Sequence, residues 1–255
     1  MRCMTPSPSL DGETMPYLSR VWLNPLRTGT QRLLRNPQAV HAAVLGGLPH
    51  QPVDERVLWR LDGTQHQRAE LLILTQSAPS WVHIVESAGW PDTAEGAAVV
   101  RDYSPFLDRL APGQQFAFRL RANPVQSTKR PEAPSSVQQQ RLKADGRQRG
   151  VIVPHRTAHH QEQWFRDRMV RWGFELPTNS DGSVQAGLVD RGRLAFSKGS
   201  AGKRSRVVLT TATFEGAVRI ADAARAREVL LSGVGKGRAY GCGLITLAPL
   251  PGADR

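Results

Sequence analysis

The segment with the most evident chemical potential is a glycine-rich stretch between residues 233 and 243. It reads GVGKGRAYGCG, and its five glycines expose bare backbone amides that can approach phosphate oxygens closely. The stretch follows a helical pattern and precedes a strand, the reverse of the order in a dinucleotide-binding loop, and it lacks the Lys-Ser/Thr ending of a P-loop. It is therefore either a phosphate-contacting loop or a glycine-rich turn that ends a helix.

Basic residues dominate the charge of the chain and are concentrated in its middle. The sequence holds 34 Lys and Arg against 22 Asp and Glu, a net charge of +12 at pH 7 with a pI near 10.9. Residues 119–206 alone carry 18 basic and 7 acidic side chains, nearly the whole excess. A generally basic proteome would account for part of this excess, but its uneven placement indicates a polyanion that meets the middle of the chain.

Histidine is the other residue type whose chemistry matters, because imidazole titrates near neutral pH and can move protons. His41 falls in a predicted helix, where a single histidine is usually structural or solvated. His155, His159 and His160 resemble a metal cluster, but neither their spacing nor accompanying cysteines and carboxylates support one. We therefore predict no metal site and no cofactor, and we expect these three side chains to contact solvent or the polyanion.

The elements that must position these residues form two similar series. In the first, Asn36 and Pro37 are typical of a helix N-terminus and predict a helix to about residue 45 that carries His41. A weaker helical pattern covers residues 94–110. Strands are expected at 17–24, 57–61, 70–76 and 115–120 in the first series and at 193–197, 206–220 and 242–247 in the second, where the helices are 159–172 and 222–231.

Each series approximates βαββαβ, which predicts an α+β protein with tandem ferredoxin-like (RRM-like) domains. Residues 1–15 are expected to be a disordered tail or a misassigned start. We expect residues 16–125 to form an N-terminal domain that carries the helix of His41, and residues 126–149, which are polar and Pro/Ser/Gln-rich, to be a linker or flexible loop. Residues 150–255 would form the C-terminal domain.

Composition also bears on the compartment. No run approaches the roughly 20 apolar residues that span a bilayer, and residues 1–14 lack the apolar centre of a signal peptide. Cys3 and Cys242 stand near opposite ends of the chain, so a disulfide framework or a thiolate metal site is not expected. These features predict a cytoplasmic protein without a membrane partner.

Two blocks of sequence carry a specific resemblance. The glycine-rich segment followed by Leu244–Leu250, and the block FRLRANP at Phe118–Pro124, resemble the Cas6e (CasE, Cse3) branch of the RAMP superfamily of type I-E CRISPR systems. The resemblance extends over essentially residues 16–250. It implies two ferredoxin-like domains and metal-independent cleavage of precursor RNA below the stem of the CRISPR repeat hairpin. It also implies that the product crRNA stays bound in the multi-subunit Cascade complex.

The resemblance also assigns the chemistry. In this family a histidine on the first helix is catalytic, and the matching position is His41, whose imidazole would act on the ribose 2′-hydroxyl or the leaving 5′-oxygen. The family commonly has tyrosine three residues earlier, where this chain has Gln38, which can donate a hydrogen bond but cannot titrate. Stabilisation of the pentavalent phosphorane would then come from Arg27, Arg32 or Arg35, each of which has a solvated surface charge as its alternative role.

RNA binding is expected mainly in the C-terminal half. Residues 191–206 contain six basic residues around a Gly/Ser turn, which the resemblance identifies as a hairpin that grips the RNA stem through its phosphates. The alternative is a solvated loop. The expected RNA-binding residues are Arg35, Arg119, Arg121, Lys129, Arg130, Arg191, Arg193, Lys198, Lys203, Arg204, Arg206, Gly235, Lys236, Gly237 and Arg238.

Two other functions share part of this pattern. A non-catalytic RAMP-type subunit that only binds guide RNA would have the same fold, basic surface and glycine-rich loop, and Gln38 in place of tyrosine keeps this alternative open. A different RRM-type RNA binder is disfavoured, because the predicted strands contain no aromatic-rich RNP block.

Overall fold

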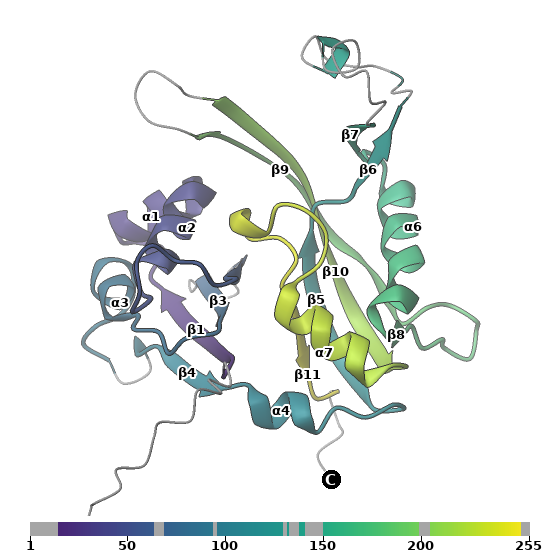
Figure 1. Cartoon of the computed structure of the whole chain (residues 1–255), viewed down its shortest axis with the longest axis horizontal. Helices are drawn as coiled ribbons and strands as arrows, with labels where there is room; N and C mark the ends of the chain where they lie inside the picture. The colour runs from purple at the N-terminus through teal and green to yellow at the C-terminus, as the bar shows by residue number, and fades with distance from the viewer. Residues whose placement is uncertain are drawn as a thin grey trace, which may run out of the picture.

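The computed structural model describes residues 15–63, 69–93, 96–129, 132, 138–140, 150–198 and 205–250. Within these ranges the chain forms two larger antiparallel sheets and a small sheet of two strands (Figure 1). The expected tail and most of the expected linker lie outside the described residues. No helix of the described part is both long and apolar enough to cross a membrane.

The first sheet is ferredoxin-like. It contains β1 (Tyr17–Leu23), β2 (Leu58–Asp62), β3 (Ala69–Thr75) and β4 (Val99–Asp102) in the order β2-β3-β1-β4, with all neighbours antiparallel. Helices α1 (Thr28–Arg35), α2 (Pro37–Leu45) and α3 (Val82–Ala88) pack on one face of it. The buried core between helices and sheet includes Val21, Leu33, Val40, Val44, Leu71, Ile73 and Ile84.

Helix α2 starts where the sequence predicts. The side chain of Asn36 accepts a hydrogen bond from the backbone amide of Gln38 at 3.0 Å, and Pro37 occupies the first turn, where it needs no amide hydrogen. Val40 and Val44 lie four residues apart and are fully buried. Their burial fixes the rotation of the helix and leaves His41 half-buried at the edge of the core.

The second sheet repeats the arrangement of the first. Its order is β11-β5-β10-β8, formed by β5 (Gln115–Ala122), β8 (Phe174–Glu175), β10 (Ser205–Ile220) and β11 (Ile245–Ala248), and β9 (Ala186–Lys198) pairs with β10. Helices α6 (Ala158–Met169) and α7 (Ala223–Ser232) pack against it. Phe165 on α6 stacks on Phe118 and Phe214 of the sheet, with ring centroids 5.6 and 4.4 Å apart. The predicted tandem ferredoxin-like α+β fold is confirmed.

Strand pairing differs from the predicted series in the middle of the chain. The strand at 115–120 was expected in the first unit, but β5 pairs with β10 and β11 of the second sheet. Strand β4 takes the place at the edge of the first sheet instead, and α4 (Ser104–Asp108) follows it. The helix predicted over 94–110 is therefore wrong at residues 99–102, which form β4. Because β4 and α3 are only four and seven residues long, neither shows a readable period.

The small sheet lies at the edge of the expected linker. Strand β6 (Val125–Thr128) pairs with β7 (Val151–Pro154), so the start of the expected linker lies next to the first strand that follows it. Two short 3₁₀ turns, η2 (Val170–Trp172) and η3 (Arg238–Tyr240), complete the described elements that bear on the site.

Candidate active site

Three segments meet beside His41. Helix α2 is in contact with η3 of the glycine-rich segment and with strand β9. Figure 1 shows the hairpin of β9 and β10 rising beside α1 and α2, with the glycine-rich segment between them. The ring of Tyr240 in η3 lies 4.6 Å from the ring of Phe196 on β9, which joins the segment to the hairpin.

His41 has an imidazole suited to accept a proton. Its Nδ1 atom is shielded from solvent and has no hydrogen-bond partner among the residues that the structure describes. Burial lowers the pKa of His41, and the positive charge of Lys198 lowers it further. The imidazole is therefore neutral at pH 7, the form that can act as a general base.

Gln38 shares this environment. It precedes His41 by three residues, so the two side chains are neighbours on one side of α2. Its Oε1 atom is also shielded and has no hydrogen-bond partner within the described ranges. An unpaired buried acceptor costs about 1–3 kcal/mol. These two shielded atoms belong to residues one helical turn apart, and a ligand could form hydrogen bonds with them once it displaces the groups that shield them.

Lys198 is the cation of this site. It is the last residue of β9, pairs with Ser205 across the hairpin and is exposed. Because side chains alternate along a strand, it points to the same face of the hairpin as Phe196. The sequence placed Lys198 among the RNA-binding residues. Strand β9, which ends at Lys198, contacts α2, and the charge of Lys198 lowers the pKa of His41.

The glycine-rich segment has a backbone conformation that favours glycine. All five of its glycines have positive φ, between 68° and 92°. Lys236 is exposed, whereas the Nε atom of Arg238 is shielded and lacks a partner among the described residues. The segment connects α7 to β11, and its 3₁₀ turn places Arg238 and Tyr240 on the side of α2.

The arginines predicted to assist His41 lie elsewhere on the first domain. Arg27 precedes α1 and donates a hydrogen bond from Nη1 to the carbonyl of Gly89 at 3.3 Å, at the end of α3. Arg32 lines a pocket of about 530 Å³ among α1, α2 and α3, together with alanines of α2 and His83. Arg35 is exposed at the end of α1. The structure does not bring Arg27 or Arg32 into contact with His41.

Arg119 and Arg121 lie on the face of the second sheet that is turned toward the first domain. Arg119 forms ion pairs with Asp62 at 3.3 Å and with Glu215 at 2.5 Å, so its charge is already balanced within the protein. Arg121 lines a pocket of about 370 Å³ together with Asp62, Arg119 and Asp190, and its Nε atom is shielded without a described partner.

The remaining predicted RNA-binding residues divide between two faces of the hairpin. Arg191 donates hydrogen bonds to Gln161 Oε1 at 2.9 Å and to the carbonyl of Arg156, which fastens it to α6. By strand alternation Arg193 and Arg206 share its face, opposite to that of Lys198, and both are exposed. Lys129 is exposed just after β6, and Arg130, Lys203 and Arg204 lie outside the described residues.

Two aromatic side chains at the site were not singled out from the sequence. Phe196 is buried in the hairpin and Tyr240 is half-buried in the glycine-rich segment. The one sequence signal was a tyrosine in a stretch otherwise rich in glycine and basic residues, a composition in which an aromatic ring has few local neighbours. Its contact with Phe196 joins residues from different elements, so periodicity does not reveal it.

The histidines of the second domain do not form a metal site in the described structure. The ring of His160 lies 6.1 Å from that of His155 and 5.8 Å from that of His159. Burial lowers the pKa of His155, as do the neighbouring His160 and Arg168. Among the described residues, no group of three or more His, Cys, Asp or Glu is placed to hold a metal ion.

The fold and the site together define a class of protein: tandem ferredoxin-like domains that place a neutral imidazole beside a basic hairpin and a glycine-rich loop, an arrangement suited to a phosphodiester. The family model described as "CRISPR associated protein" matches residues 16–249. The chain therefore belongs to this family.

Individual relatives agree with the family. The chain is 29% identical to the CRISPR-associated endoribonuclease Cse3 of Thermus thermophilus, over 91% of this chain and all of that protein. It is 26% identical to the Cascade subunit CasE of Escherichia coli K12, over 69% of this chain and 78% of that one. A structure of Thermus thermophilus Cse3 bound to an RNA representing a pre-cleavage complex superposes with a TM-score of 0.67, at 26% identity, over 92% of this chain and all of that chain. The resemblance to the Cas6e branch is confirmed.

Proposed function

We propose that the chain is a metal-independent endoribonuclease that binds the CRISPR repeat hairpin and cleaves precursor crRNA below the stem. The observation that carries the proposal is the environment of His41: a shielded imidazole nitrogen without a partner among the described residues, on a helix that contacts the strand of Lys198. The similarity over all of an endoribonuclease, Cse3, supports the same activity.

In the proposed reaction the neutral imidazole of His41 takes the proton of a ribose 2′-hydroxyl, and the freed oxygen attacks the adjacent phosphorus. The P–O5′ bond then breaks and its electrons stay on the 5′-oxygen, which takes a proton from the imidazolium or from water. The products are a 2′,3′-cyclic phosphate and a 5′-hydroxyl. The nucleophile belongs to the RNA, so the reaction consumes no water.

Charged and polar neighbours would stabilise the phosphorane. Lys198 supplies a positive charge on the side of His41, and an ion at such a position favours the developing negative charge of the transition state. Gln38 would position the reacting ribose and phosphate through hydrogen bonds of its amide. Arg27 and Arg32 would act on the RNA only through a rearrangement, because both are turned to other parts of the first domain.

The stem of the repeat would bind along the hairpin and the glycine-rich segment. Exposed Arg193, Lys198 and Arg206 line two faces of the hairpin, and Lys236 extends from the segment. Contacts of this kind go to phosphates and recognise the A-form shape of the stem. The proposal includes retention of the crRNA in a Cascade complex and a location in the cytoplasm. The similarity to a protein named as the Cascade subunit CasE supports the first of these.

The test is to incubate the purified chain with the repeat RNA of its host in EDTA and to map the product ends. Cleavage at one position with a 2′,3′-cyclic phosphate and a 5′-hydroxyl is expected, together with resistance of a substrate whose nucleophilic 2′-hydroxyl is replaced by hydrogen. Tight binding without any cleavage would instead establish the non-catalytic guide-RNA-binding subunit. Cleavage of the deoxy substrate would exclude the mechanism.

A further inference from the structure

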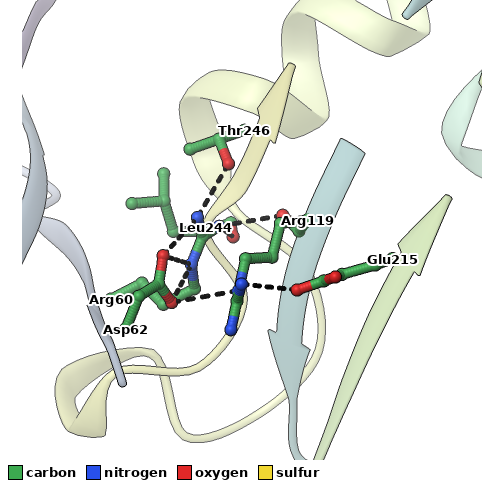
Figure 2. Close-up of polar contacts among 6 residues, drawn as sticks. All are labelled: Arg60, Asp62, Arg119, Glu215, Leu244 and Thr246. Atoms are coloured by element: carbon green, nitrogen blue, oxygen red, sulfur yellow. Dashed lines mark hydrogen bonds and ion pairs between the residues drawn. The ribbon is translucent and has the colours of Figure 1, made fainter. Parts of the chain in front are cut away.

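Arg60 connects the two domains from within. Its side chain is almost fully buried on β2 of the first sheet, and its Nε and Nη2 atoms donate to the carboxylate of Asp62 at 2.8–3.0 Å. The same guanidinium donates to the carbonyls of Arg119 and Leu244 at 2.8 and 3.0 Å, and to Thr246 Oγ1 at 2.8 Å. Figure 2 shows these bonds converging on Arg60 from β5 and from the end of the glycine-rich segment.

The two residues before Arg60 contact the glycine-rich segment as well. A Cβ atom built on Gly241 would lie 2.5 Å from the ring of Trp59, and one built on Gly233 would lie 2.7 Å from the side chain of Leu58. Strand β2 therefore contacts the glycine-rich segment at Gly233, its first residue, and at Gly241, next to η3. It also contacts Leu244, the residue that follows the segment. The close approach at Gly233 and Gly241 is possible because glycine has no side chain.

The segment is closed at its base by its own backbone. The amide of Val234 donates to the carbonyl of Gly243 at 2.9 Å, and the amide of Gly243 donates to the carbonyl of Arg121 on β5 at 2.7 Å. Between these ends, η3 contacts both β2 and α2. Contacts from β2 therefore help to set the position of η3 relative to α2, the helix that carries His41.

We infer that Leu58, Trp59 and Arg60 of β2 hold the glycine-rich segment in place against helix α2, which carries His41. Arg60 is then a positioning residue for RNA cleavage. This inference rests on the proposed function. Arg60 touches neither His41 nor the surface that would meet RNA in the described structure; it acts through Leu244 and the segment that precedes it. A shift of about 1 Å in a group that positions substrate can slow catalysis by about a hundred-fold.

The first test is Gly241→Ala, which places a methyl group against Trp59 without touching a charged residue. We expect single-turnover cleavage to slow by roughly ten- to hundred-fold when it is measured at saturating protein, so that a change in affinity for the repeat does not enter the rate. Gly182→Ala is the matched control, because Gly182 has a similar φ of 80° and nothing within 4 Å of an added Cβ atom. It carries the same backbone strain away from the site and should cleave at the wild-type rate.

The second test is Arg60→Lys, which keeps the charge but cannot reach all the acceptors of the guanidinium at once. We expect hydrogen–deuterium exchange to rise in residues 233–243 and to stay unchanged in α2, with the same loss of cleavage rate. Wild-type cleavage by Gly241→Ala, or unchanged exchange of the segment in Arg60→Lys, would overturn the inference. A wild-type chain that fails to cleave at all would overturn the proposed function instead, and the exchange measurement would still test the role of Arg60.

Discussion

The surroundings of His41 and of Arg60 are two buried polar regions with opposite hydrogen-bonding states. At Arg60 all three guanidinium nitrogens donate to described acceptors, and these acceptors come from both domains. At His41 a shielded nitrogen has no described partner, and the neighbouring oxygen of Gln38 has none either. A satisfied buried network specifies one arrangement of the chain, whereas unpaired atoms retain the capacity to bond a substrate.

The comparison predicts that removal of His41 affects chemistry and leaves the fold intact. His41→Ala should slow cleavage by about 100- to 10,000-fold, the contribution of a positioned general base. The free energy of unfolding should change by less than about 1 kcal/mol, because His41 donates or accepts no side-chain hydrogen bond among the residues that the structure describes. Single-turnover rates and urea titrations measure both quantities, and exposed His50→Ala serves as control. Full activity of His41→Ala would contradict the proposed role of His41 as general base.

The reverse outcome is expected at Arg60. Arg60→Met leaves the carboxylate of Asp62 buried beside Arg119 alone and removes two bonds to backbone carbonyls, so the free energy of unfolding should fall by about 3–5 kcal/mol. The double variant Arg60→Met/Asp62→Leu removes both charges and should recover part of this loss. Urea denaturation measures the two values. If Arg60→Met is as stable as the wild type, the hydrogen bonds of Arg60 contribute little to the free energy of unfolding.

Gln38 tests whether its side-chain amide donates a hydrogen bond from Nε2 to the charged reacting phosphate. One positioned hydrogen bond to a charged group contributes roughly 1.5–3 kcal/mol, so Gln38→Ala should slow single-turnover cleavage by about ten- to hundred-fold. Gln38→Tyr, which restores the residue common in the family, should keep or raise activity. Binding to the repeat hairpin is measured separately for both. If Gln38→Ala cleaves normally and Gln38→Tyr is inactive although both bind RNA, the active site is not on this side of α2.

The smallest expected effect is on pH dependence. The pKa of His41 lies below its ordinary value of 6.5, so the neutral base persists to lower pH and kcat/KM should rise with pH through a limb below 6.5. Lys198→Ala removes one cause of the shift, so the limb should move up toward 6.5, whereas Lys198→Arg keeps the charge and should leave it in place. If kcat/KM rises with pH over the same range in both variants, the charge of Lys198 does not act on His41.

Prediction from the sequence succeeded where the signal is local. The repeated order of strands and helices predicted the tandem fold, and Asn36 with Pro37 predicted the start of α2. It was wrong for β4 and for the membership of β5, because the four-residue strand has no period and because element order does not say which sheet a strand joins. The roles of the predicted site residues stay predictions. Of those residues, the structure brings Gln38, His41, Lys198 and the glycine-rich segment together.

The sequence by itself determined the elements that short-range physics controls: the cap and proline that start α2, the spacing of Gln38 and His41 on one helix, the positive φ of the glycines and the basic charge of the hairpin. Only the tertiary structure decided that Lys198 acts on His41 and that Arg60 bonds residues 184 and 186 positions away. Such contacts join residues of the two domains. No local pattern encodes them, because the partners are distant in sequence and come together only where the two domains pack against each other.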